Sequence, residues 1–121
     1  MIIGFDRVVL MCKDTGATRA WYEQAGFPYL RGFGGMHWLS LGDSEVMLHP
    51  AEGPVAASET SIHALVQDAD IAFAKVRAAG LDPYDHLQPG VRLEGPVTRE
   101  WGDREFELVD PDGQRWAFTE R

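Results

Sequence analysis

The chain contains the same pattern twice, at a constant spacing of 54 positions. Each copy begins with an aspartate, continues through good helix formers and ends in Ala-Gly followed by an apolar residue, over 14–27 and again over 68–81. An aspartate before a helix accepts hydrogen bonds from the first free N–H groups, which favours a helix start in both copies. Gly26 and Gly80 stand where a helix ends in the left-handed conformation. The repeat therefore predicts two similar modules with one helix each.

Strand-like segments surround both predicted helices, with one before each helix and three after it. The predicted strands are 5–11, 29–32, 36–41, 45–49, 61–66, 81–86, 104–109 and 115–119. Residues 42–44 (Gly-Asp-Ser) and 110–113 (Asp-Pro-Asp-Gly) are typical hairpin turns between the last two strands of each module. The order strand-helix-strand-strand-strand, found twice, predicts an α+β fold.

The length of the chain leaves room for one domain only. Its 121 residues, 45% hydrophobic and 25% charged, have the composition of an ordinary globular protein. We expect module one to cover about 1–52 and module two about 58–121, with Gly53 and Pro54 in the link over 51–57. No apolar run is long enough for a membrane helix, and the N-terminus lacks the features of a signal peptide. These observations predict a cytoplasmic protein with no membrane partner.

Charge and cysteine content narrow the classes of partner. The net charge of −8, with only scattered arginines, argues against nucleic-acid binding and favours cationic small molecules, which a negative field attracts. Cys12 is the only cysteine, so no internal disulfide is possible. Its apolar neighbours predict a core position in a strand rather than a nucleophile.

The most specific segment covers residues 99–113 and reads REWGDREFELVDPDG. It resembles the Trp-Gly-x-Arg-Glu-Phe-x-Leu-x-Asp-Pro-x-Gly segment of bleomycin-resistance-type members of the vicinal oxygen chelate superfamily, with one extra residue between Gly102 and Arg104. Glyoxalase I and extradiol dioxygenases belong to the same superfamily. Together with the duplication, the resemblance covers essentially the whole chain. It implies that each module forms a half-barrel cup and that two cups, paired in a homodimer, enclose the site.

The resemblance also places four positions at which the enzymatic members hold a divalent metal, on the first and last strand of each module. In this chain these positions carry Arg7, Met47, Ser61 and Ala117. None of the four is a ligand for a hard or borderline divalent ion, and the arginine adds a repelling charge. The sequence therefore predicts no metal, no other cofactor and no metal-based catalysis.

Two histidines keep an alternative open. His63 and His49 each lie two residues after one of the predicted positions and hence on the same face of their strands. A metal site displaced by two residues in both modules would make the chain a metal-dependent glyoxalase-like or dioxygenase-like enzyme. A solvated or hydrogen-bonded histidine is the commoner case. No Ser/His/Asp or Cys/His arrangement indicates nucleophilic catalysis.

The four tryptophans have different expected roles. Trp21 lies on the apolar stripe of the first helix and is predicted to be a core residue. Trp116 precedes Ala117 and so points to the opposite face of its strand, toward a helix. Trp38 fits the core or the pocket equally well. Trp101 lies in an irregular polar stretch, and the resemblance implies that it stacks against a flat ligand, as the tryptophan of this segment does in bleomycin-resistance proteins.

These inferences predict a metal-free protein that binds and sequesters a flat, cationic antibiotic or a related metabolite; a small-molecule sensor or accessory subunit is the plainer alternative. Flanking glycines make Phe33 a plausible lid. Five acids of the long loop and its strand are expected at a solvated edge or around the cationic group: Glu94, Glu100, Asp103, Glu105 and Glu107. The predicted ligand-contacting residues are Trp101, Trp38, Phe33, Met47, Ser61, His63, Arg7 and Phe106.

Overall fold

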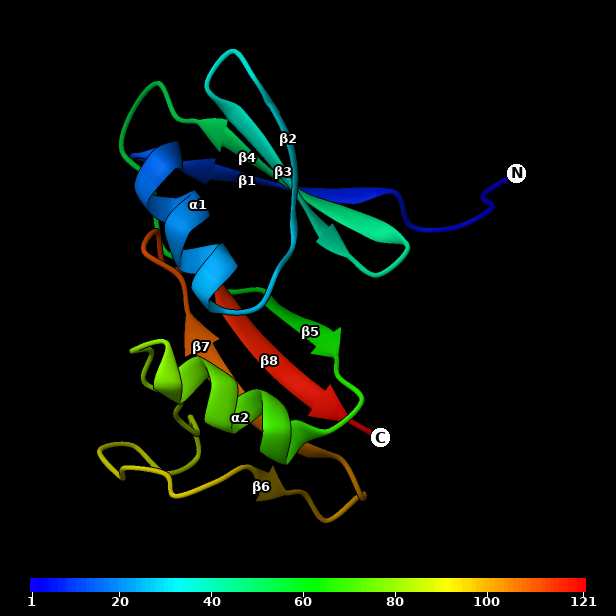
Figure 1. Cartoon of the computed structure of the whole chain (residues 1–121), viewed down its shortest axis with the longest axis vertical. Helices are drawn as coiled ribbons and strands as arrows, with labels where there is room; N and C mark the ends of the chain where they lie inside the picture. The colour runs from blue at the N-terminus through cyan, green and yellow to red at the C-terminus, as the bar shows by residue number, and fades with distance from the viewer.

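The computed structural model describes residues 1–121 and forms two modules, each with four strands and one helix (Figure 1). The first module contains β1 (Arg7–Cys12), α1 (Thr15–Gln24), β2 (Tyr29–Phe33), β3 (Met36–Leu41) and β4 (Ser44–Pro50). The second contains β5 (Ser61–Leu65), α2 (Ala69–Ala78), β6 (Val97–Thr98), β7 (Arg104–Val109) and β8 (Arg115–Glu120). The predicted α+β class and the duplicated strand-helix-strand-strand-strand order are confirmed.

The two sheets have the same topology. Sheet 1 has the order β1-β4-β3-β2 and sheet 2 the order β5-β8-β7-β6. In each, the first strand pairs in parallel with the last strand of its own module, and the remaining pairs are antiparallel. Both sheets are open, because no strand joins β1 to β2 or β5 to β6.

The helix ends follow the sequence signals. Asp14 accepts hydrogen bonds from the N–H groups of Gly16 and Ala17, both at 3.1 Å, and Asp68 accepts one from Ile71 at 3.0 Å. Gly26 and Gly80 follow the helices with φ angles of 101° and 93°, the left-handed region that glycine adopts at little cost.

One core joins the two modules. The indole of Trp116 in β8 is fully buried and donates from Nε1 to the hydroxyl of Tyr22 in α1 at 2.8 Å, and that hydroxyl donates to Asp110 at 2.6 Å. The ring of Phe27 packs edge-on against both Tyr22 and Trp116. Trp116 therefore faces the helices as predicted, and Trp21 packs, partly buried, against the same core.

The segment over 81–86 is not the predicted strand. It is a loop that touches β7 through one bridge, in which the main chains of Tyr84 and Glu107 exchange hydrogen bonds of 2.9 and 3.0 Å. The strand that follows α2 is instead β6, only two residues long. Three prolines and two glycines between 83 and 96 explain the difference, since proline cannot donate to a ladder and glycine weakens a strand.

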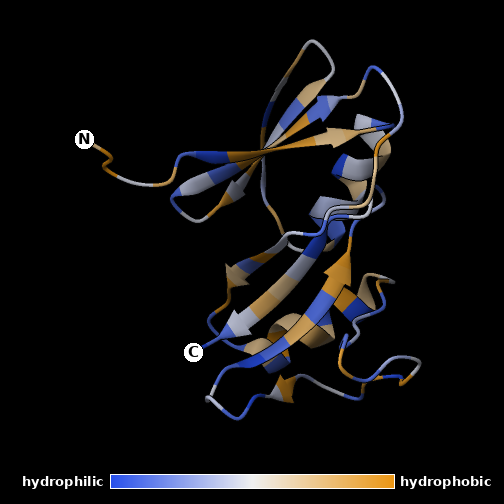
Figure 2. Ribbon diagram, turned by 180° about the vertical axis from the view of Figure 1, so that it is seen from behind, coloured by the Kyte–Doolittle hydropathy of each residue, from blue (hydrophilic) through white to orange (hydrophobic).

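The N-terminal arm, residues 1–5, extends away from the body of the molecule (Figures 1 and 2). Its apolar side chains Met1, Ile2, Ile3 and Phe5 are all exposed. Neither helix is long and apolar enough to cross a membrane.

Candidate functional site

Alternate residues of each strand point away from the covering helix, and we call that side the helix-free face of the sheet. Figure 2 shows sheet 2 from this side, with α2 behind it. On sheet 1 the helix-free face is formed mainly by Arg7, Val9, Met11, Trp38, Glu45, Met47 and His49. On sheet 2 it is formed by Ser61, His63, Leu65, Glu105, Glu107, Val109, Arg115, Ala117 and Thr119.

The four positions that the resemblance assigns to a metal occupy equivalent places in the two sheets. In sheet 1, Arg7 pairs in register with Glu45, which is two residues before Met47. In sheet 2, Ser61 pairs in register with Arg115, which is two residues before Ala117. The two predicted positions in each sheet are therefore diagonal neighbours across two parallel strands. The geometry of a duplicated site is retained, but a guanidinium, a thioether, a hydroxyl and a methyl group do not form a ligand set for a divalent cation.

The two histidines of the displaced-site alternative lie on different sheets and have other partners. His63 Nδ1 is 3.1 Å from the hydroxyl of Thr119, and His49 Nδ1 is 2.8 Å from the main-chain oxygen of Pro50. Neither belongs to a group of three or more metal-ligating side chains. The pair does not form a metal site within one chain.

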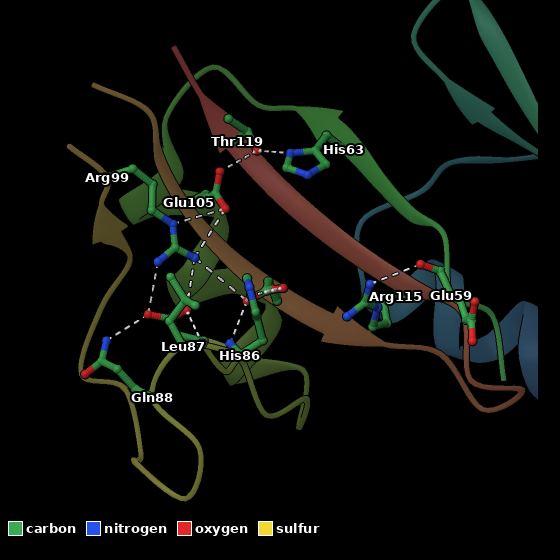
Figure 3. Close-up of polar contacts among 11 residues, drawn as sticks. Glu59, His63, His86, Leu87, Gln88, Arg99, Glu105, Arg115 and Thr119 are labelled. Carbon is green, nitrogen blue, oxygen red and sulfur yellow. Dashed lines mark hydrogen bonds and ion pairs between the residues drawn. The ribbon is translucent and has the colours of Figure 1, made fainter. Parts of the chain in front are cut away.

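The helix-free face of sheet 2 contains a buried ion cluster (Figure 3). Arg99 donates two hydrogen bonds to the Asp85 carboxylate at 3.0 and 3.2 Å and two longer ones to Glu105 at 3.4 Å. All three side chains are less than one tenth exposed. The loop that carries Asp85 covers this part of the sheet, so acids expected at a solvated edge are inside the molecule.

Hydrogen bonding determines the charge state of Asp85. Burial opposes ionisation of its carboxyl, but hydrogen bonds from Arg99, from the side chain of Gln88 and from the N–H of Leu87 outweigh burial and lower its pKa to about 2. The carboxylate is therefore charged at neutral pH and permanently paired with the guanidinium.

The same cluster contains the one group of side chains whose spacing could suit a metal ion. Ligand atoms of Asp85, His86 and Glu107 lie within 4.8 Å of one another. However, Asp85 is paired with Arg99, and Glu107 lies 2.8 and 2.9 Å from Nδ1 of His86 and accepts the His86 main-chain N–H at 2.8 Å. A guanidinium also lies 3.8 Å from Glu107. A metal ion would have to displace the hydrogen bonds that these carboxylates already make to Arg99 and His86, so the residues do not fit a metal.

Two predicted aromatic contacts, Trp101 and Phe33, are exposed. Trp101 lies in the turn between β6 and β7, is 70% exposed and donates from Nε1 to Asp103 at 3.1 Å. Phe33 ends β2 and is 77% exposed. The turn after β2 and the turn after β6 lie at opposite ends of the molecule (Figure 1), so one chain does not bring these rings together.

Two other predicted contacts are less accessible. Trp38 is half-buried on sheet 1 beneath the guanidinium of Arg31, whose carbon is 4.9 Å from the ring centroid. Phe106 is only 1% exposed, because its side chain points toward α2 and packs against Phe73 and Phe118. Phe106 is therefore a core residue and not part of the helix-free face.

Cys12 is buried in the core, as predicted. Burial, with the charges of Asp112 and Asp110, raises the pKa of its thiol to about 12. The thiol is protonated at neutral pH and has no role as a nucleophile.

A duplicated module with two open, helix-backed sheets defines the vicinal oxygen chelate class of fold. The chain matches the Glyoxalase/Bleomycin resistance protein/Dioxygenase superfamily over residues 4–118 and belongs to it.

Solved structures with this fold have different functions. A bleomycin-binding protein complexed with bleomycin is 24% identical, with a TM-score of 0.72, over 99% of both chains. TioX from Micromonospora sp. ML1 is 23% identical, with a TM-score of 0.71, over 97% of this chain and 98% of that one. A lactoylglutathione lyase from Agrobacterium tumefaciens is 16% identical, with a TM-score of 0.70, over 97% and 92%. At these identities the similarity establishes the fold alone. No protein of curated function matches the chain.

Proposed function

We propose that this chain is a metal-free small-molecule binding protein of the bleomycin-resistance type. It would sequester a flat, cationic antibiotic or a related metabolite without changing it chemically, as a cytoplasmic resistance protein does. One observation carries the proposal: both sheets keep the equivalent positions of the duplicated site, and these positions hold Arg7, Met47, Ser61 and Ala117. Such a fold retains surfaces for binding, while the Lewis acid that metal catalysis requires has no ligands.

The helix-free face of sheet 1 suits a flat ring. Val9 and Met11 are about half exposed, and Trp38 and Met47 are register partners in the neighbouring strands. Arg31, stacked over Trp38, illustrates how a flat cation fits this surface. The net charge of −8 adds a long-range attraction for a positively charged ligand.

A second copy of the chain completes the proposed site. Trp101 and Phe33 are on different modules and far apart in one chain, so a pocket with both walls needs two chains. A dimer with twofold symmetry would also cover the exposed apolar side chains of β1 and of the arm. Sedimentation at micromolar concentration should give twice the chain mass of 13.5 kDa. A clean monomer would contradict the composite pocket.

Intrinsic fluorescence tests the ligand class directly. Trp38 and Trp101 lie at the proposed walls, while Trp116 is buried in the core and supplies a constant background. Titration with bleomycin in the presence of a chelator should quench part of the emission and reach saturation. Emission that stays unchanged up to millimolar bleomycin would exclude this ligand class.

A further inference from the structure

Arg115, at the start of β8, is the one arginine of the strands without a carboxylate partner. Arg7, Arg31 and Arg104 each form an ion pair of 3.0 Å or less. The guanidinium of Arg115 makes one hydrogen bond, from Nη2 to the main-chain oxygen of Glu59 at 3.2 Å (Figure 3). Its Nε is buried and donates to no acceptor.

A buried N–H group without an acceptor is rare in native proteins, and on a cation it leaves a charge-assisted hydrogen bond unmade. The acids nearest to Arg115 do not fill this role. The Glu59 carboxylate is not within 4.0 Å of the guanidinium, and Glu107 is held by His86. Within the chain, the Arg115 Nε–H therefore has no acceptor.

Two hydroxyl groups are further donors: one lies beside Arg115 on the helix-free face of sheet 2, and the other lies one strand further away. Ser61 is the register partner of Arg115 on β5, and the serine hydroxyl makes no hydrogen bond within the chain. Tyr84 lies on the other side, next to β7, and its hydroxyl is also free. Burial and the charge of Glu107 raise the pKa of Tyr84, and the nearby charge of Arg115 opposes this rise. The phenol is therefore neutral at pH 7 and can donate a hydrogen bond.

An apolar hollow adjoins Tyr84. Val109, the register partner of Arg115 on β7, lines a cavity of about 500 Å³ together with Tyr84, Trp21 and Leu81. Leu108 and Asp82 also line this cavity, whereas Arg115 and Ser61 do not; its apolar side chains lie on the neighbouring strand β7 and beyond it. A hollow of this kind, one strand away from a cation, suits a flat apolar group that carries an anion at one end.

We propose that Arg115, with Ser61 and Tyr84, forms an oxyanion-binding subsite for a carboxylate or phosphate group of the ligand. The planar fork of arginine matches the two oxygens of such a group. The inference rests on the proposed function and narrows it, because a ligand attracted by the net negative charge would then be a zwitterion with an oxyanion beside its flat ring. At physiological ionic strength the Debye length is about 8 Å, so acids farther away than this repel the oxyanion only weakly.

The test uses small probes and the whole protein. The Nε–Hε signal of Arg115 is followed by NMR while sodium benzoate, sodium phosphate, benzamidine hydrochloride or sodium chloride is added at constant ionic strength. Benzoate and benzamidinium have the same flat ring and opposite charges. We expect benzoate to shift the signal and reach saturation, and chloride and benzamidinium to leave it unchanged. A response to phosphate as well would support the subsite and show that the ring is dispensable.

Variants separate this subsite from general charge effects. Arg115→Gln should weaken benzoate binding about tenfold to a hundredfold, followed at the Ser61 amide, since it removes a charged hydrogen-bond donor. Arg115→Lys keeps the charge but lacks the planar guanidinium, so its affinity for benzoate should lie between those of the wild type and Arg115→Gln. This variant keeps the test valid if Arg115→Gln misfolds. Arg104→Gln, on the same sheet but paired with Asp70, is the matched control and should bind benzoate like the wild type.

Three results would overturn the inference: no saturable shift with benzoate or phosphate, an equal shift with benzamidinium, or equal loss of binding in both glutamine variants. Failure of the antibiotic proposal gives a different pattern, in which bleomycin does not quench tryptophan emission while benzoate still saturates Arg115. If bleomycin binds and Arg115 responds to no anion, the subsite alone is refuted.

Discussion

Replacing Arg99 by methionine tests the buried ion cluster of sheet 2. The variant keeps most of the side-chain volume and removes the charge that holds Asp85 and Glu105 inside the molecule. The fall in the pKa of Asp85 from its usual 3.8 to about 2 corresponds to roughly 2 kcal/mol of stabilisation. Leaving a buried carboxylate without its partner costs more, about 3–5 kcal/mol. We therefore expect Arg99→Met to lose about 3–5 kcal/mol of unfolding free energy at pH 7.

Urea denaturation at a fixed protein concentration measures this loss. With an m-value of about 1.5 kcal/mol/M, the midpoint should fall by about 2–3 M. Arg104→Met is the matched control, because its bidentate pair with Asp70 lies at the surface and surface pairs contribute about 1 kcal/mol or less. Equal midpoints for the wild type and Arg99→Met would refute the cluster as a structural element.

The pH dependence has a definite sign. Because the folded-state pKa of Asp85 is depressed, its stabilisation is present above about pH 4 and is lost in the wild type as the pH falls toward 2. In Arg99→Met the unpaired Asp85 is instead easier to protonate than in an unfolded chain, so acid removes the penalty. The stability difference between the two proteins should shrink from pH 7 to pH 3, and a constant difference would contradict the assignment.

Three smaller predictions concern the core, the proposed pocket wall and the thiol. Tyr22→Phe leaves the buried indole N–H of Trp116 and Oδ2 of the buried Asp110 without a partner and should cost about 1–3 kcal/mol in thermal or urea unfolding; an unchanged midpoint would contradict this. Trp101→Ala should weaken ligand binding by about 1–3 kcal/mol with little change in stability, whereas Trp116→Ala, in the buried core, should destabilise the fold and affect binding only through misfolding; the opposite pattern would disprove the pocket role. Cys12 should resist a thiol reagent in the native protein and react once urea unfolds it, and rapid native labelling would show that the thiol is accessible.

Local signals explain why the modules could be predicted from the sequence. An aspartate N-cap and a left-handed glycine act within a few residues, so Asp14 and Gly26, and their counterparts 54 positions later, mark the helices reliably. The prediction of a strand over 81–86 was wrong because Pro83 has no N–H to donate to a neighbouring strand. The pattern of apolar residues does not reveal this loss.

Long-range pairing explains why much of the candidate site could not be predicted. Arg99 meets Asp85 across fourteen positions, and the loop that brings them together has no regular structure. The position of Phe106 follows from strand alternation, since Phe106 and Leu108 share one face and the acids between and beside them share the other. Alternation alone would have placed Phe106 toward the helix, but it gives no indication that Glu105 and Glu107 are buried.

Metal content tests the central claim most directly. Protein purified without chelators from cells supplied with zinc, nickel, manganese and iron should contain well below one divalent ion per chain, because Arg7, Met47, Ser61 and Ala117 provide no ligand set. The chelator-treated protein should bind its ligand as well as the untreated one. About one divalent ion per chain, with binding or activity lost on chelation and restored by the metal, would contradict the account.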